Sequence, residues 1–286
     1  MQEPMMTIST IGDLKKKLSE IRQGRSVGFI PTMGALHEGH LSLIRQARQD
    51  CDILVASIFV NPLQFGPKED FSIYPRTLLS DQKMCEQHKV DILWTPTQRE
   101  LFPTSFQTSI EVQPLSQRWE GATRPGHFKG VATIVAKLLQ VVHPEHLYLG
   151  QKDYQQFRVV EQMLSDLHFD TTVHLSETIR EKDGLALSSR NLRLSPTERK
   201  AAPIVFRGLR QAGQMVAKGE KNARDIVAKA TSTIQSEPLA QIDYLVLCDP
   251  KTLEPIEPLE KTSILLVAVK IGDIRLLDNI FLSPSE

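Results

Sequence analysis

One stretch decides the fold of this chain: Val27-Gly-Phe-Ile-Pro-Thr-Met-Gly-Ala-Leu-His-Glu-Gly-His-Leu41. Its first four residues are mainly apolar and predict a short buried strand. Beyond the glycine-containing turn, apolar residues recur at roughly helical spacing, at Leu41, Leu43, Ile44 and Ala47. A strand, a tight turn and a helix in this order predict the first unit of an α/β fold.

The two histidines of this stretch, His37 and His40, lie three residues apart, which places both on one face of the first helical turn. A helix start presents free backbone N–H groups and the positive end of the helix dipole, so phosphate binds well there. Gly34 lets a ligand approach the turn closely, and Gly39 keeps the space between the histidines clear. Two imidazoles at such a site can donate hydrogen bonds to phosphate oxygens while negative charge builds on them.

Two other interpretations of the histidine pair remain open. A pair of histidines with this spacing is often an accident of the surface or the core. The pair could also be half of a metal site, although its order and spacing differ from those of zinc proteases. Its position directly after a strand, with glycines in the turn, favours the phosphate site.

The composition is that of an ordinary globular protein and argues against several classes. Basic and acidic residues number 34 each, so no net charge draws the chain to nucleic acid or to an anionic membrane. Three scattered cysteines argue for reduced thiols rather than a disulfide framework or a cysteine zinc site. The N-terminus lacks a signal-peptide pattern, and the longest apolar run, 264–269, is far shorter than the roughly 20 residues of a membrane span. We therefore expect a soluble, cytoplasmic protein that binds neither nucleic acid nor membranes.

Strands and helices alternate over the first part of the chain. We expect strands at 27–30, 53–60, 91–95, 146–149 and 172–175, and helices at 11–22, 41–48, 78–88, 131–142 and 154–167. This alternation predicts a doubly wound α/β fold, a parallel sheet covered by helices on both faces. In such sheets ligands bind at the carboxyl ends of the strands. The strand at 53–60 is apolar almost throughout, which fits a central position.

The pattern changes near residues 177–183. Ser195-Pro-Thr-Glu198 is a capping box with proline in the first helical position, and it predicts a helix from there to about Val216. A second helix at 223–234 and strands at 244–247, 264–269 and 275–282 are expected to follow. We therefore predict two domains, 1–178 and 179–286, of which the second is a smaller α+β domain.

Polar groups follow two of the predicted strands. Asn61 and Gln64 lie in a loop fixed by proline and glycine, where their amides can bind a hydroxyl or a carboxylate; ordinary turn chemistry explains them equally well. Gly150-Gln-Lys-Asp153 lies between a strand and a helix, so Lys152 is suited to bind phosphate beside a helix start. Gln156 lies one turn farther along that helix.

Two predicted loops carry further polar groups. Leu187-Ser-Ser-Arg-Asn191 offers two hydroxyls and a guanidinium, which can hold a polyphosphate. Residues 120–128 could form a lid or a plain surface connection. Neither loop is specific by itself, because such residues are common on protein surfaces.

Together, five motifs resemble those of the pantoate–β-alanine ligase (pantothenate synthetase) family, and the resemblance covers essentially the whole chain. The motifs are Pro31-Thr-Met-Gly-Ala-Leu-His-Glu-Gly-His40, Ser57-Ile-Phe-Val-Asn-Pro-Leu-Gln-Phe65, Tyr74-Pro-Arg-Thr77, Gly150-Gln-Lys-Asp-Tyr-Gln-Gln156 and Leu187-Ser-Ser-Arg-Asn191. The first is also typical of the wider superfamily of His-x-Gly-His nucleotidyltransferases, whose Rossmann-like domain binds ATP. The resemblance thus implies a Rossmann-like N-terminal domain for ATP and pantoate, and a C-terminal domain that acts as a lid.

The resemblance implies an ATP-dependent ligation in two steps. The carboxylate of (R)-pantoate attacks the α-phosphate of ATP to give pantoyl adenylate and pyrophosphate, and the amine of β-alanine then displaces AMP to form pantothenate, the vitamin from which coenzyme A is made. By resemblance, the catalytic residues are His40, His37, Lys152, Ser188, Ser189 and Arg190. The ATP-binding residues are Met33, Gly34, Ala35, Leu36, His37, Glu38, Gly39, His40, Gly150, Gln151, Lys152, Asp153, Ile179, Leu187, Ser188, Ser189 and Arg190. Pantoate and β-alanine would contact Gln64, Gln156 and Asn61.

Mg²⁺ and a homodimer are expected from the family alone. Where some members have two acidic residues after Tyr-Pro-Arg-Thr, this chain has Ser80-Asp81. Asp81 is therefore a weak candidate for a metal ligand, and the Mg²⁺ ligands stay open. By the same resemblance, residues 120–127 would serve dimer contact or gating.

Two other functions remain as alternatives. Another His-x-Gly-His nucleotidyltransferase would adenylate a different small carboxylic acid; an aminoacyl-tRNA synthetase is disfavoured because tRNA requires a basic surface. The chain could also be a nucleotide-binding module without catalysis, although His37, His40 and Lys152 are all retained.

Overall fold

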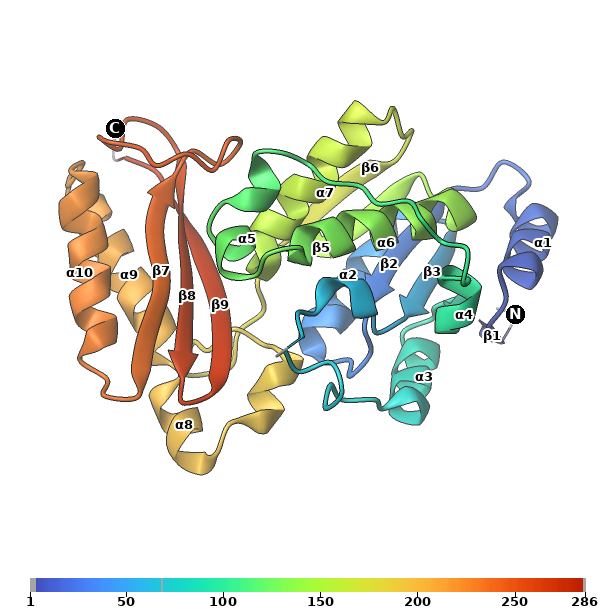
Figure 1. The fold of residues 1–286 in the computed structure, drawn as a ribbon, viewed down its shortest axis with the longest axis horizontal. Helices are drawn as coiled ribbons and strands as arrows, with labels where there is room; N and C mark the ends of the chain where they lie inside the picture. Colours follow the sequence, from blue (N-terminus) through green and yellow to red (C-terminus); the bar gives the residue numbers. More distant parts are fainter. Residues whose placement is uncertain (1–3, 68, 285–286) are drawn as a thin grey trace. The chain divides into compact units, whose positions relative to one another are not determined.

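The computed structural model describes residues 4–67 and 69–284, which divide by their contacts into two compact units (Figure 1). The first unit runs to Gln117 and includes Arg124–Gly150 and Gln156–Glu177. The second consists of Arg118–Thr123, Gln151–Gln155 and the chain from Thr178 onward. Two short segments from the first 178 residues thus belong to the second unit by their contacts.

A parallel sheet is the centre of the first unit; among the described residues its order is β1-β4-β3-β2-β5-β6. Its strands are β1 (Met6–Ile8), β2 (Val27–Thr32), β3 (Ile53–Ile58), β4 (Ile92–Trp94), β5 (His146–Gly150) and β6 (Thr172–Ser176). From β2 the chain winds outward through β3 and β4, and then adds β5 and β6 on the other side of β2. The direction of winding reverses between β2 and β5, and the carboxyl ends of these neighbours form the edge at which doubly wound sheets bind ligands.

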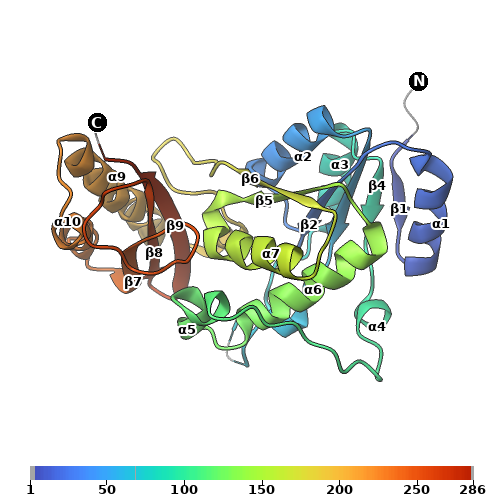
Figure 2. The same ribbon diagram turned by 90° about the horizontal axis from the view of Figure 1, so that it is seen from above.

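Helices cover both faces of this sheet (Figure 2). On one face lie α2 (Glu38–Asp50) and α3 (Leu78–Gln87), and on the other α6 (His127–Val142) and α7 (Tyr154–Asp166). Leu41, Ile44 and Ala47 of α2 pack into one apolar cluster with residues of β2 and β3, as their helical spacing predicts. The unit also contains α1 (Ile11–Arg22), α4 (Gln98–Leu101) and the three-ten turns η1 (Pro62–Gln64) and η2 (Leu115–Gln117). The predicted Rossmann-like sheet is confirmed.

The second unit combines an antiparallel sheet with helices, which confirms the predicted α+β class. Its strands β7 (Ala240–Cys248), β8 (Ser263–Ile271) and β9 (Ile274–Leu282) pair in that order. Leu209, Ile226 and Ile234 from the helices share a buried core with Leu265 and Val267 of the sheet. The other elements are α5 (Glu120–Thr123), η3 (Gln151–Asp153), η4 (Ser189–Arg193), α8 (Pro196–Ala201), α9 (Ile204–Ala217) and α10 (Ala223–Gln235).

Several boundaries differ from the sequence prediction. The helix expected from 196 to 216 is broken into α8 and α9, because Pro203 between them lacks a backbone N–H and disrupts a continuous helix. The segment 120–128, predicted as a loop, contains α5 and the start of α6. Strand β1 was not expected, since three residues carry too little pattern. Within residues 4–67 and 69–284, no helix combines the length and apolar character of a membrane span.

Candidate active site

The predicted site residues are divided between the two units. The first unit contains Met33 to His40 together with Asn61, Gln64, Asp81, Gly150 and Gln156. The second contains Gln151, Lys152, Asp153, Ile179 and residues 187–190. Each unit therefore has its own group of predicted phosphate- or substrate-binding side chains.

His37 and His40 form the cap of α2 and fix each other's orientation. His37 is the N-cap residue, and its Nδ1 accepts a hydrogen bond from the backbone N–H of Gly39 at 3.2 Å. The Nδ1 of His40 accepts from the backbone N–H of His37 at 3.3 Å, so the pair makes a reciprocal capping box with ring centroids 4.2 Å apart. Because each Nδ1 is an acceptor, the proton of each neutral ring resides on Nε2. The start of α2, just beyond the carboxyl end of β2, thus carries two imidazole N–H donors.

Asp81 holds the turn that precedes these histidines. Gly34 and Ala35 have φ values of 81° and 50°, the left-handed conformation that costs an L-residue energy. The buried carboxylate of Asp81 accepts from the backbone N–H groups of Ala35 at 3.0 Å and Leu36 at 2.9 Å. The hydroxyl of Thr77 donates to the same carboxylate. Both carboxylate oxygens are therefore bonded within the protein, which favours a structural role over the metal-binding role for which Asp81 was a candidate.

Asn61 and Gln64 form a pair of amides beside the same turn. Asn61 is 1% exposed and caps η1, and its Nδ2 donates to Oε1 of Gln64 at 3.0 Å and to the carbonyl oxygen of Gly130 at 3.1 Å. The Nε2 of Gln64 lies 3.4 Å from Sδ of Met33, the first residue after β2. Gln64 thus reaches the turn that leads to the histidines, while the amide of Asn61 is used to orient it.

Helix α6 supports η1 from the other side, a feature that the sequence analysis missed. The Nδ1–H of His127 donates to the carbonyl oxygen of Gln64 at 2.8 Å, and Arg124 donates to the same oxygen at 3.2 Å. Arg124 also forms an ion pair with Glu69. Burial by itself would raise the pKa of Glu69, but the hydrogen bonds and the charge of Arg124 lower it. A Cβ on Gly130 would lie 2.2 Å from a backbone oxygen of η1, so only glycine permits this approach. Arg124-Pro-Gly-His127 lies in the segment 120–128, for which the sequence left a lid and a plain surface connection equally open.

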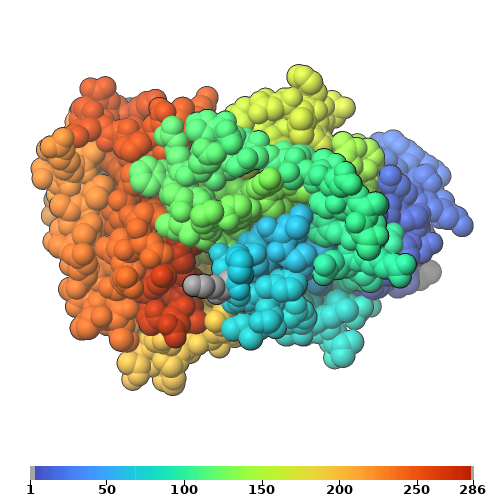
Figure 3. Space-filling view, viewed as in Figure 1, coloured from blue at the N-terminus to red at the C-terminus, as the bar shows by residue number. Residues whose placement is uncertain are grey.

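Of the chain between η1 and α3, residues 72, 73, 76 and 77 are exposed on the first unit, while Tyr74 is buried. This part of the chain is seen in cyan in the space-filling view (Figure 3). Leu79 at the start of α3 is 78% exposed. Asp81, two residues later, is turned inward to the Gly34–Leu36 turn.

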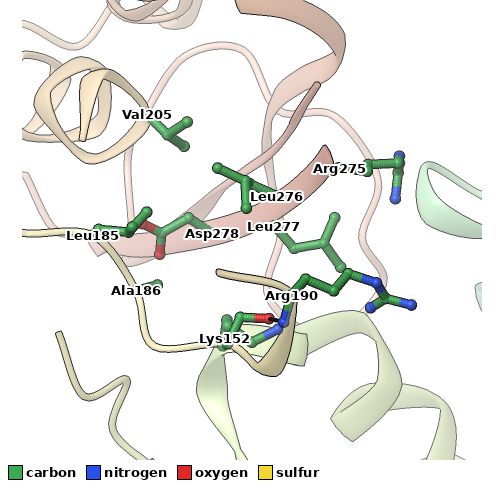
Figure 4. Close-up of a pocket in the computed structure, with 10 residues that line it drawn as sticks. Lys152, Leu185, Ala186, Arg190, Val205, Arg275, Leu276, Leu277 and Asp278 are labelled. Atoms are coloured by element: carbon green, nitrogen blue, oxygen red, sulfur yellow. Dashed lines mark hydrogen bonds between the residues drawn. The ribbon is translucent and has the colours of Figure 1, made fainter. Parts of the chain in front are cut away.

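A pocket in the second unit contains three of the predicted phosphate-binding residues, Lys152, Ser188 and Arg190 (Figure 4). Its other lining residues are Leu185, Ala186, Val205, Arg275, Leu276, Leu277 and Asp278. The charge of Arg275 is balanced by ion pairs with Glu120 and Asp243, both at 2.6 Å. Lys152 lies on η3, and its Nζ is 2.9 Å from the carboxylate of Asp153. The pocket therefore combines basic groups and the carboxylate of Asp278 with apolar walls.

The segment with Ser188 and Arg190 is held as a tight loop. Ser188 caps η4, because its Oγ accepts from the backbone N–H of Arg190 at 3.3 Å. The backbone N–H of Leu187 donates to the carbonyl oxygen of Ile179 at 3.0 Å. The Nδ2 of Asn191 donates to the carbonyl oxygen of Ala186 at 3.0 Å. Hydroxyl and guanidinium groups are thus presented on an ordered backbone.

The described residues do not form a resident metal centre: within 4–67 and 69–284, no three or more His, Cys, Asp or Glu side chains are grouped so that they could hold a metal ion. Mg²⁺ commonly needs only one or two carboxylates when substrate phosphates provide other ligands.

Known proteins resemble this chain over nearly its whole length. The family model described as pantoate-beta-alanine ligase matches residues 6–281. The chain is 47% identical to a pantothenate synthetase of Heliobacterium modesticaldum, over 91% of this chain and 92% of that protein. It is 44% identical to a pantothenate synthetase of Pelotomaculum thermopropionicum, over 97% of this chain and 99% of that protein. Among solved structures, the pantothenate synthetase of Thermus thermophilus has a TM-score of 0.94 and 42% identity, covering 98% of this chain and 100% of that one.

The pantoate-beta-alanine ligase of Francisella tularensis, solved as a complex with beta-gamma ATP and beta-alanine, has a TM-score of 0.81 and 34% identity over 96% of this chain and 97% of that one. The family model and the curated relatives extend over nearly the whole chain, through both units described above. The chain therefore belongs to the pantoate–β-alanine ligase family.

Proposed function

We propose that this chain condenses (R)-pantoate with β-alanine at the expense of ATP, through a pantoyl adenylate. The observation that carries the proposal is the reciprocal cap of His37 and His40, which puts two Nε2–H donors where a doubly wound sheet binds its ligand. The family supports the substrates, and the ATP and beta-alanine in the Francisella tularensis structure support their use here. The alternative of a different carboxylic acid is less well supported, because curated relatives of 44–47% identity are pantothenate synthetases.

In the first step, a carboxylate oxygen of pantoate attacks the α-phosphorus of ATP. A new P–O bond forms, the bond from the α-phosphorus to the bridging oxygen breaks, and pyrophosphate leaves with the electron pair. Negative charge moves onto the phosphate oxygens during this transfer, and hydrogen bonds from His40 and His37 become stronger as it does. His40 is the proposed main donor and His37 assists it. Phosphoryl transfer needs mostly positioning and charge neutralisation, which a rigid cap provides.

In the second step, the amine of β-alanine attacks the acyl carbon of the adenylate. The C–N bond forms, the bond from carbon to the AMP oxygen breaks, and the amine proton is lost to give the amide. The activated acyl group needs no protein nucleophile, but water must be excluded from it. We propose that Gln64, oriented by Asn61, binds pantoate with Gln156, and that Gln64 also faces β-alanine.

We further propose that both units act on the same ATP molecule. The segment Met33–His40, with Gly150, would bind it from the first unit. Gln151, Lys152, Asp153, Ile179 and residues 187–190 would bind it from the second, with Lys152, Ser188, Ser189 and Arg190 at the phosphates. In this proposal, residues 1–178 form the ATP- and pantoate-binding domain and 179–286 act as a lid. Two buried oxygens, Thr178 Oγ1 and Asn191 Oδ1, have no hydrogen-bond partner among the described residues, which supports a polar ligand near residues 187–191.

Three accompanying properties belong to the same proposal. Mg²⁺ would enter bound to ATP and reduce the charge of its phosphates. The protein would act in the cytoplasm, where its three buried cysteines, which form no disulfide, stay reduced. It would work as a homodimer, to which the segment 120–127 contributes contacts or gating. Light scattering of the purified protein would decide the oligomeric state.

The test of the proposed function is product formation by the purified protein. With ATP, Mg²⁺, pantoate and β-alanine, we expect equal amounts of AMP and pantothenate, and neither product when any one substrate is omitted. AMP formation with a different acid, and none with pantoate, would favour another adenylating enzyme. Binding of ATP without any turnover would favour a non-catalytic module.

A further inference from the structure

The side chain of Asn279 in β9 bonds the turn that carries Lys152. Its Nδ2 donates to the carbonyl oxygen of Gln151 at 2.8 Å and to that of Lys152 at 3.1 Å. Its Oδ1 accepts from Nε2 of Gln151 at 3.1 Å. Asn279 is 1% exposed, and both ends of its amide are used in these bonds. Its side chain therefore contacts the pocket region through the η3 turn.

The preceding residue of β9 bonds the other segment of the pocket. Asp278 lines the pocket and makes a bidentate ion pair with Arg180, at 2.6 and 2.8 Å. Arg180 is bridged to Ala186 by backbone hydrogen bonding, in the loop that leads to Ser188. Its guanidinium also lies 3.8 Å from the ring centre of Phe206. Two neighbouring residues of one strand thus hold the two segments that bring Lys152 and Arg190 to the pocket.

We propose that Asn279 is a positioning residue for Lys152, and that its three hydrogen bonds set the ATP affinity of the pocket. The inference rests on the proposed role of Lys152 at the phosphates. The flexible stem of a lysine is anchored at its backbone, so a shift of the η3 backbone changes the positions that the charge can reach. Without Asn279, two carbonyl oxygens lose a buried donor and η3 is free to move. A displacement of the η3 turn would matter, because charge-assisted contacts to phosphate depend on distance and direction.

A double-mutant cycle on the full chain tests this proposal. The dissociation constant of ATP with Mg²⁺, without pantoate, is measured by calorimetry for the wild type, Asn279→Ala, Lys152→Ala and the double variant. We expect each single change to weaken binding by about tenfold, since each removes the same charged contact. The double variant should bind no more than about twofold more weakly than Lys152→Ala. A merely structural role of Asn279 would instead multiply the two effects.

Matched variants keep the outcome decisive. Asn222→Ala removes two hydrogen bonds from the cap of α10, away from the pocket lining, and should lower stability without changing the ATP affinity. If Asn279→Ala does not fold, Asn279→Ser, which keeps a donor, replaces it in the cycle with an expected loss of about threefold.

The outcomes separate this inference from the proposed function. If Lys152→Ala binds ATP normally, the phosphate role of Lys152 and the inference are both wrong. If Lys152→Ala binds weakly, but the Asn279 variant binds normally or its effect multiplies with that of Lys152→Ala, only the inference is overturned.

Discussion

Replacing Asp81 with asparagine should loosen the turn before the histidines without removing a group that contacts substrate. In the wild type, one carboxylate oxygen accepts from the backbone N–H of Leu36 at 2.9 Å, and the other from that of Ala35 at 3.0 Å. An asparagine has only one oxygen, so its NH₂ group would face the second N–H group. The variant therefore keeps the shape of the side chain but leaves one buried backbone donor without an acceptor.

The size of the effect follows from these two bonds. A buried N–H group without a partner costs about 1–3 kcal/mol, and the remaining bond loses its charge assistance. We expect the free energy of unfolding to fall by about 2–4 kcal/mol, against the 5–15 kcal/mol that is typical of a folded protein. The variant should still fold. Because the turn fixes the backbone before His37, kcat should fall by about 10- to 100-fold, the loss expected for a displacement near 1 Å.

Unfolding by urea in the presence of EDTA, together with the rate of AMP formation, tests this prediction. The control is Thr77→Val, which removes one hydrogen bond to Asp81 but leaves both backbone contacts, and should cost about 1 kcal/mol. EDTA removes any contribution of a metal ion to stability. An Asp81→Asn variant as stable as the wild type in EDTA, but with a raised requirement for Mg²⁺, would refute the structural role and restore Asp81 as a metal ligand.

Three further changes have distinct expected outcomes. His40→Ala should cost about 1 kcal/mol of stability through the lost cap but abolish adenylate formation, and a folded variant with normal activity would remove His40 from the mechanism. Gly130→Ala should separate α6 from η1, lower the unfolding temperature and raise the KM for pantoate more than that for ATP, whereas Gly12→Ala, with open space around the new Cβ, should change neither KM. Burial and the nearby His146 lower the pKa of His174 below 6.5. As the pH drops below about 6.5, the unfolded chain takes up a proton at this histidine before the folded chain does, so the stability should fall. Urea unfolding at each pH should show a less steep fall for His174→Gln.

The parallel sheet and most of its strands and helices could be predicted, because each of those elements has its own local pattern. The apolar run at 53–60 became the central strand β3, and the spacing of Leu41, Ile44 and Ala47 produced the buried face of α2. The position of the histidines at the start of α2 was also predictable, since they lie three residues apart beside a strand–turn–helix junction, but their reciprocal cap was not predicted.

The supports of the candidate site depend on contacts between residues distant in the sequence, which local pattern does not encode. Asp81 lies 45 residues from the turn that it holds, and Asn279 lies 128 residues from Gln151. A signal existed for the second case: Asp278 and Asn279 place two polar side chains inside an otherwise mainly apolar strand. Buried polar residues need partners, but the sequence does not say which ones.

Isotope exchange between pyrophosphate and ATP tests the central claim, the pantoyl adenylate, most directly. The measurement contains Mg²⁺ and pantoate but no β-alanine, and His40→Ala serves as the control. Labelled pyrophosphate should enter ATP only when pantoate is present, and the variant should show no exchange. If no exchange occurs, yet AMP and pantothenate form once β-alanine is added, the two-step account is contradicted.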